Sequence, residues 1–154
     1  MQENICCFFG HRTIDETEEL KRGVEEVVER LITECGVDTF LFGSRSRFDS
    51  FCLETVTKIK ERYPHIKRVY VRAEYPHIDE KYVAYLLERY DETYYPEKIM
   101  GAGKLVYVER NYEMVDKSKY CIVYYEGNRE KSGTEISLEY ARKKNREIIM
   151  FPLK

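Results

Sequence analysis

Residues of the kinds that bind phosphate recur in small groups along the chain. Glycine lets the backbone approach a ligand closely, and hydroxyl, guanidinium and imidazole groups donate hydrogen bonds to anionic oxygens. A helix that begins beside such a group adds free N–H groups and the positive end of its dipole. These features favour a ligand that carries phosphate or pyrophosphate. The residues predicted to bind it are Gly10, His11, Arg12, Gly43, Ser44, Arg45, Arg110, Gly127, Asn128, Ser132, Gly133 and Thr134.

Simpler explanations exist for each group taken alone. Gly10 and Gly43 suit ordinary turns between a strand and a helix, and Ser132 or Thr134 suits a helix N-cap. The chain has no G-x-x-x-x-G-K-[ST] sequence, and no G-x-G-x-x-G follows its first apolar run. It therefore carries neither the P-loop nor the dinucleotide-binding fingerprint. The prediction of an anion site depends on whether the fold brings these groups together.

Apolar runs alternate with stretches of helical periodicity. Residues 5–9 are apolar on both faces, which is typical of a buried strand in a parallel sheet. The other predicted elements are strands at 39–42, 68–73, 121–125 and 147–151 and helices at 20–32, 51–59, 82–87, 110–118 and 133–144. We expect Thr13 or Asp15 to cap the first helix and Gly36 to end it. The alternation predicts an α/β, Rossmann-like three-layer fold with an open, mainly parallel sheet and helices on both faces.

In open parallel sheets, ligands bind beyond the carboxyl ends of the strands, where the strand order reverses. The candidate glycines Gly10 and Gly43 directly follow predicted strands, and Glu74 and Tyr75 follow the third. We therefore expect one site at this edge of the sheet, within a single domain that spans residues 1–154.

The amino-acid composition argues against several classes of binding partner. The 26 Lys and Arg residues are balanced by 28 Asp and Glu residues, for a net charge of −2, so nucleic acid is not the expected partner. No apolar run reaches the roughly eighteen residues that a membrane span needs, and no signal peptide is visible. The five cysteines show no C-x-x-C spacing. They predict buried, reduced thiols in a cytoplasmic protein, with no metal site and no cofactor.

Tyrosine is unusually frequent, with fourteen residues against no tryptophan. Many of these rings suit core packing, as at Tyr70 and Tyr82. Others crowd the stretch 90–108, which shows no clear periodicity, and its surroundings. We expect this stretch to form a flap over the phosphate-binding turns, with Tyr75 or Tyr125 stacking on a base. The basic cluster from Lys58 to Arg72 is most simply a solvated face.

The motifs together resemble those of the SLOG superfamily, the Rossmann-like group named for the Smf/DprA proteins and the LOG phosphoribohydrolases. The similarity is greatest to its small YpsA-like branch and covers most of the chain. Its marks here are Phe8-Phe9-Gly10-His11-Arg12, Phe42-Gly43-Ser44 and Lys131-Ser132-Gly133-Thr134. The resemblance implies binding of a nucleotide or nucleotide-derived small molecule, with NAD-derived and cyclic nucleotides among the candidates. It also implies a role as a sensor or sequestering protein, including in antiviral signalling, and we expect a homo-oligomer.

The alternative function is hydrolysis of a nucleoside 5′-monophosphate at its N-glycosidic bond, as in the LOG enzymes. Arg110 and Met114 keep the spacing of that family's catalytic Arg and a following Met. The position of the family's catalytic Glu, however, falls on Ser137. If the protein is an enzyme, Arg110 would stabilise charge, and Glu74 or Glu126 would take the acid–base role.

Overall fold

The computed structural model describes residues 1–43, 46–127 and 133–153. Its described residues form a six-stranded sheet in the order β4-β3-β2-β1-β5-β6, and every neighbouring pair of strands is parallel. The strand order reverses between β1 and β5, because the chain moves outward from β1 to β4 and then crosses back. The strands are β1 (Gln2–Gly10), β2 (Thr39–Phe42), β3 (Lys67–Val71), β4 (Glu92–Tyr94), β5 (Ser118–Tyr124) and β6 (Glu147–Phe151).

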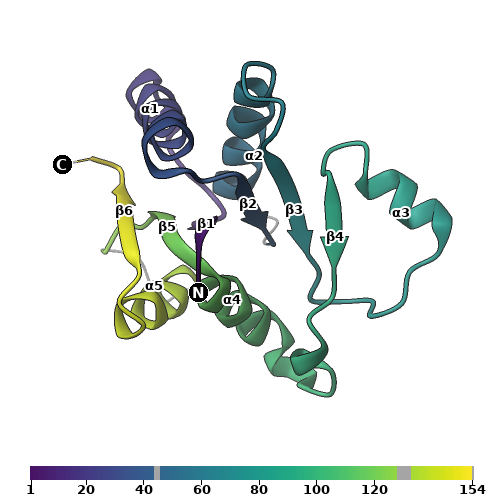
Figure 1. Cartoon of the computed structure of the whole chain (residues 1–154). Helices are drawn as coiled ribbons and strands as arrows, with labels where there is room; N and C mark the ends of the chain where they lie inside the picture. Colours follow the sequence, from purple (N-terminus) through teal and green to yellow (C-terminus); the bar gives the residue numbers. More distant parts are fainter. Residues whose placement is uncertain (44–45, 128–132, 154) are drawn as a thin grey trace.

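Helices cover both faces of the sheet (Figure 1). Helices α1 and α2 pack on one face and α4 and α5 on the other, whereas α3 lies beyond the edge strand β4. This arrangement confirms the predicted α/β three-layer fold. The helices are α1 (Glu18–Cys35), α2 (Arg47–Lys60), α3 (Glu80–Leu86), α4 (Val106–Lys117) and α5 (Gly133–Lys143), with short 3-10 helices at Glu97–Ile99 and Gly103–Leu105.

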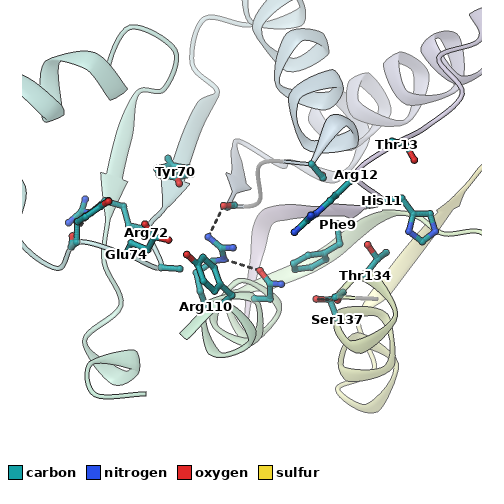
Figure 2. Close-up of a pocket in the computed structure, with 18 of the residues that line it drawn as sticks. Phe9, His11, Arg12, Thr13, Tyr70, Arg72, Glu74, Arg110, Thr134 and Ser137 are labelled. Carbon is teal, nitrogen blue, oxygen red and sulfur yellow. Dashed lines mark hydrogen bonds between the residues drawn. The ribbon is translucent and has the colours of Figure 1, made fainter. Parts of the chain in front are cut away.

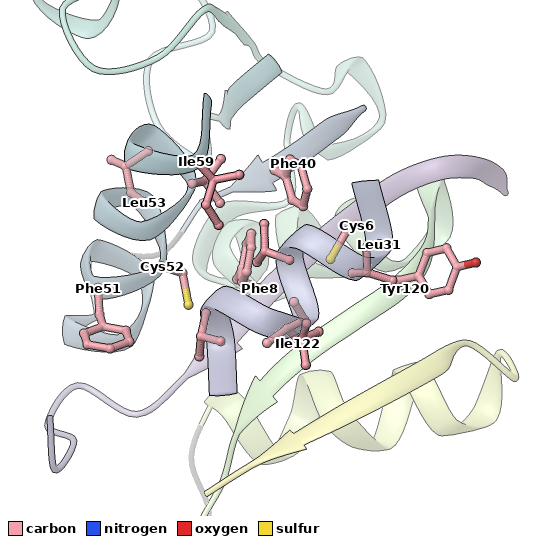
Figure 3. Close-up of a cluster of buried hydrophobic side chains, with 14 of the residues drawn as sticks. Cys6, Phe8, Leu31, Phe40, Phe51, Cys52, Leu53, Ile59, Tyr120 and Ile122 are labelled. Atoms are coloured by element: carbon pink, nitrogen blue, oxygen red, sulfur yellow. The ribbon is translucent and has the colours of Figure 1, made fainter. Parts of the chain in front are cut away.

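The central strand β1 supplies side chains to both cores, as its apolar run predicts. Cys6 and Phe8 point to the α1–α2 side, and Cys7 and Phe9 point to the α4–α5 side. Figure 3 shows the first of these cores, in which Phe8 lies among side chains from α1, α2 and β5. The Phe8 ring also stacks on Phe42, with 4.8 Å between ring centroids. Aromatic pairs of this geometry contribute about 1 kcal/mol beyond the area they bury.

Three local predictions need correction. Neither Thr13 nor Asp15 caps α1, because the Thr17 side chain accepts the hydrogen bond from the backbone N–H of Leu20. The stretch 90–108 does not form a flap, since it contains β4, both 3-10 helices and the first turn of α4. Cys35 is exposed, although the other four cysteines are buried; all five are free. The predicted end of α1 is confirmed, with Gly36 in the left-handed conformation at φ 71°.

Within the described residues, none of the helices combines the length and the apolar character needed to span a bilayer.

Candidate functional site

A cavity of about 1100 Å³ opens at the carboxyl ends of the strands, on the edge predicted from the sequence. Its walls come from the ends of β1 and β3, from the residues after β1, β2 and β3, and from the first two turns of α4 and α5 (Figure 2). The volume lies slightly above the range of small-molecule sites, which is roughly 300–1,000 Å³. The lining residues among the predicted set are Gly10, His11, Arg12, Gly43, Glu74, Tyr75, Arg110, Gly133 and Thr134.

His11 joins the ends of β1 and β5. Its side chain is buried, and its Nε2 atom accepts a hydrogen bond from the backbone N–H of Glu126 at 2.9 Å. A backbone N–H can only donate, so Nε2 carries no proton in this arrangement. The ring also meets Tyr124 edge-on at 6.0 Å between centroids. His11 therefore shapes the wall of the cavity as a neutral ring, instead of donating to an anion through Nε2 as a cation.

The first turn of α5 forms the neighbouring wall. Thr134 is buried there and lines the cavity together with Gly133 and Ser137. The Ser137 hydroxyl donates to the backbone oxygen of Gly133 at 3.0 Å, within the same helix. Arg12 extends into the cavity from the turn after β1 (Figure 2). This side thus combines a guanidinium group with the N-terminal end of an eleven-residue helix, a combination that favours an anion.

Arg110 lies at the centre of the cavity and connects two strand ends. Its Nη1 atom donates to the backbone oxygen of Gly43 at 2.6 Å and to that of Val71 at 3.1 Å. Its Nε atom donates to Asn111 Oδ1 at 2.9 Å (Figure 2). A guanidinium group has five N–H donors, so the two on Nη2 remain without a hydrogen bond to a described residue. Arg110 is therefore both a structural clamp and a candidate donor to a ligand.

A buried carboxyl group lies near Arg110. Asp49, in the first turn of α2, is 2% exposed, and its Oδ1 atom has no hydrogen-bond partner among the described residues. Burial raises the pKa of Asp49 well above its ordinary value, against the opposing effect of Arg110. Burial also lowers the pKa of Arg110, which still stays protonated because a guanidinium group ordinarily titrates above 12. None of the Arg110 hydrogen bonds within the described residues goes to Asp49, so the two Nη2 donors can still meet an anion in the cavity.

The opposite wall comes from the end of β3. Arg72 is buried there and donates hydrogen bonds to the following loop and to β4. Its Nε atom donates to the backbone oxygen of Tyr75 at 3.2 Å, and its Nη1 atom donates to Thr93 Oγ1 at 3.1 Å. Tyr75 has a φ of 59°, a conformation uncommon for a residue other than glycine. Arg72 thus holds Tyr75 at the mouth of the cavity. The prediction that the basic cluster up to Arg72 is a solvated face is wrong for this residue.

The strand boundary explains why Arg72 was missed. The predicted strand ran to Ala73, which placed Arg72 inside it, whereas β3 ends at Val71. Arg72 is thus the first residue beyond the carboxyl end of the strand, where site residues are expected. Tyr70 and Tyr82, which were assigned to core packing, also line the cavity.

Tight packing accounts for both glycines at the strand ends. A Cβ atom at Gly10 would lie 2.4 Å from the Cβ atom of Phe48 on α2. At Gly43 it would lie 2.8 Å from Arg110 Cδ and 2.8 Å from Met114 Sδ. The neighbours that exclude a side chain are therefore helices α2 and α4. The sequence allows two explanations for these glycines, the close approach of a ligand and an ordinary turn between a strand and a helix.

Some predicted residues lie apart from the cavity. Gly127 is exposed and Glu126 half-buried, and neither lines it; the Glu126 carboxylate accepts from the Tyr124 hydroxyl at 2.7 Å. Tyr125 is also absent from the lining, and its hydroxyl donates to Glu135 Oε1 at 3.0 Å. Four further candidates lie outside the described residues: Ser44, Arg45, Asn128 and Ser132.

The tyrosines predicted to form a flap take different places. Tyr90 stacks on Tyr70 at 5.1 Å between ring centroids and packs against the core. The Tyr94 hydroxyl donates to Glu113 Oε2 at 3.0 Å, on α4. Tyr75 and Tyr107 do line the cavity. Tyr90 and Tyr94 are therefore held within the fold, whereas the tyrosines that line the cavity lie on β3, the loop after it, α3 and the first turn of α4.

Comparison with known proteins adds little to this geometry. No protein-family model matches the chain, and no curated protein matches it. One solved structure with similarity to the chain is a truncated form of 3-deoxy-D-arabino-heptulosonate 7-phosphate synthase from Thermotoga maritima, at 14% sequence identity and a TM-score of 0.35. The similarity covers 96% of this chain and 51% of the synthase, so the chain spans about half the length of that protein. At this TM-score the likeness says nothing about a shared ligand or activity.

Proposed function

We propose that the cavity binds a nucleotide or nucleotide-derived small molecule, in a SLOG-like domain that senses or sequesters this ligand. The observation that carries the proposal is the meeting of Arg12, Arg110 and the N-terminal end of α5 in one cavity at the carboxyl edge of the sheet. Three arginines line it in the described part of the chain, against one carboxylate, that of Glu74. Such an excess of positive charge favours a phosphate-bearing ligand, although the whole chain is slightly acidic.

Aromatic side chains support the nucleotide part of the proposal. Tyr70, Tyr75 and Tyr82 line the cavity on the β3 side. Arg12 and the first turn of α5, the proposed phosphate-binding groups, lie on the other side of Arg110 (Figure 2). A ligand with a planar base at one end and phosphate at the other matches both halves, because every base has a face on which an aromatic ring can stack.

Ligand-induced stabilisation tests the proposal. With adenosine 5′-monophosphate, NAD or cyclic ADP-ribose at about 100 times its dissociation constant, we expect about 2.7 kcal/mol of stabilisation. This corresponds to a rise in the melting temperature of about 5 °C or more for a chain of this size. Adenosine, which lacks the phosphate, is the matched control and should shift the melting temperature much less. If none of these nucleotides stabilises the protein, the proposed binding function is contradicted.

A phosphoribohydrolase is the second candidate. The observation in its favour is that Arg110 and the Glu74 carboxylate line the same cavity. Against it, Ser137 occupies the position of the catalytic Glu in the LOG motif, and its hydroxyl is bonded within its own helix. Chromatography of the same incubations separates the two candidates. Intact nucleotide after a thermal shift supports a binding protein, whereas released base and ribose 5-phosphate would overturn that assignment.

We also propose a homo-oligomer in the cytoplasm. Support for association comes from Met100 and Leu105, which are 57% and 59% exposed on the segment before α4. Support for the compartment comes from the five free cysteines, because reducing conditions preserve free thiols. Light scattering coupled to size-exclusion chromatography should give at least twice the monomer mass. Replacing Met100 and Leu105 with Ser should lower that mass, and a monomer in the unaltered protein would contradict the assembly.

A further inference from the structure

The charged and polar groups that line the cavity are distributed unevenly over its sides. The Arg12 guanidinium and Thr134 lie on the side formed by β1 and α5, whereas Glu74 lies on the side formed by β3 (Figure 2). Arg110 stands between the two sides. Glu74 supplies the one carboxylate among the described lining residues. Arg72 also lies on the β3 side, but its guanidinium donates to Tyr75, Pro76 and Thr93. The Arg12 side chain makes no hydrogen bond with a described residue, so a phosphate group finds an available cationic donor on the side formed by β1 and α5.

The Glu74 carboxylate has hydrogen-bonding capacity to offer a ligand. It is exposed and makes no hydrogen bond or ion pair with a described residue, although its charge offsets part of the lowering of the Arg110 pKa by burial. An ionised carboxylate only accepts hydrogen bonds, with room for about four donors. It therefore suits a part of the ligand that carries hydroxyl groups and no charge.

The tyrosines beside Glu74 indicate which part of the ligand this is. Tyr75 follows Glu74 directly, and its ring lies 6.0 Å from that of Tyr82 between centroids. Arg72 holds the Tyr75 backbone through its carbonyl oxygen at 3.2 Å, so the position of the ring relative to Glu74 is constrained. In a nucleotide, the sugar lies between the base and the phosphate. A base against these rings and a phosphate near Arg12 would place the sugar next to Glu74 and Arg110.

We propose that Glu74 accepts hydrogen bonds from the ribose hydroxyls, so that the cavity selects ribonucleotides over 2′-deoxyribonucleotides. The inference rests on the proposed nucleotide-binding function. In Rossmann sheets that bind dinucleotides, an acidic side chain accepts a hydrogen bond from the ribose 2′-hydroxyl, so a carboxylate suits this task. A hydroxyl that binds a carboxylate adds more to affinity than one that binds a neutral acceptor.

Calorimetric titration measures this selection. Adenosine and guanosine 5′-monophosphates are each compared with their 2′-deoxy forms, and we expect the ribonucleotide to bind about tenfold more tightly. In a Glu74→Ala variant we expect the ratio to fall below about threefold, since the acceptor is gone. Glu80→Ala is the matched control, because Glu80 is also exposed and acidic but does not line the cavity. This control should keep the ratio of the unaltered protein.

The outcomes separate the two proposals. Equal binding of ribo- and deoxyribonucleotides to the unaltered protein would overturn the ribose inference and leave nucleotide binding in place. A preference that survives Glu74→Ala would overturn the role of Glu74. Binding of neither form would overturn the proposed function itself, and the ribose inference with it.

Discussion

A Gly10→Ala variant is expected to lose about 2–3 kcal/mol of its free energy of unfolding, the upper part of the usual range for overpacking. The added Cβ atom would meet three Phe48 atoms at 2.4 to 2.5 Å, and one of these is the Phe48 Cβ atom, which side-chain rotation cannot move away. Phe48 is fully buried, so α2 itself must shift. Urea unfolding followed by circular dichroism measures the loss.

Gly133→Ala is the matched control for this substitution. Among the described residues, nothing lies within 4 Å of a Cβ atom at Gly133, and the residue opens α5, where alanine is a better helix former. We expect its free energy of unfolding to stay the same or rise by up to about 1 kcal/mol. Wild-type stability of Gly10→Ala would contradict the described packing of α2 on β1. The shift of α2 should also weaken ligand binding, because its N-cap Ser46 lines the cavity.

Replacing Arg110 with Met is expected to lower the free energy of unfolding by roughly 3 kcal/mol and to weaken nucleotide binding at least tenfold. The loss of stability arises because the backbone oxygens of Gly43 and Val71 lose their donor, and Asp49 loses its cationic neighbour. The loss of affinity arises because the charge and the Nη2 donors leave the cavity. Urea unfolding and calorimetric titration measure the two effects separately.

Two further variants separate these effects. Arg110→Lys keeps the positive charge but loses the planar set of guanidinium N–H donors. We therefore expect part of the affinity for nucleotide to remain, while the free energy of unfolding stays low because the ends of β2 and β3 are no longer bridged. Arg89→Met removes the same charge from an exposed position outside the cavity and should change neither stability nor affinity by more than about 0.5 kcal/mol. If Arg110→Met is destabilised but binds nucleotide with unchanged affinity, Arg110 is a structural clamp and has no part in binding.

The fold could be predicted from the sequence at those strands whose burial requires a recognisable run of apolar residues. The run 5–9 is apolar on both faces because β1 is the central strand, with helices packed on either side. β6 coincides with its prediction at 147–151, since its apolar run 148–151 directly follows the polar stretch 143–147. The strand β4 has only three residues, Glu92–Tyr94, so no period of two can be recognised in it. Its position follows from pairing with β3, which is a tertiary contact.

The candidate site was predicted in outline but not in its contacts. The edge of the sheet follows from the alternation of strands and helices, and this places Gly10, Arg12 and Thr134 around one cavity. The pairing of Arg110 with Gly43 and Val71 joins residues up to 67 positions apart, and no local pattern encodes such a contact. The N-cap of α1 was uncertain for a different reason. Thr13, Asp15 and Thr17 all have cap-forming side chains, and the capping-box glutamate three residues after Thr17 is replaced by Leu20.

The position of β5 next to β1 has a consequence for folding kinetics. Cys7 and Cys121 are paired across these two strands, with 3.5 Å between their sulfur atoms, yet they are 114 residues apart in the chain. The loop that must close before they meet is about three times as long as the one that joins β1 to β2. Closing it costs about 1 kcal/mol more in chain entropy. We therefore expect β1, β2 and β3 to assemble first, and the cavity to gain its α5 wall only when the last third of the chain has docked.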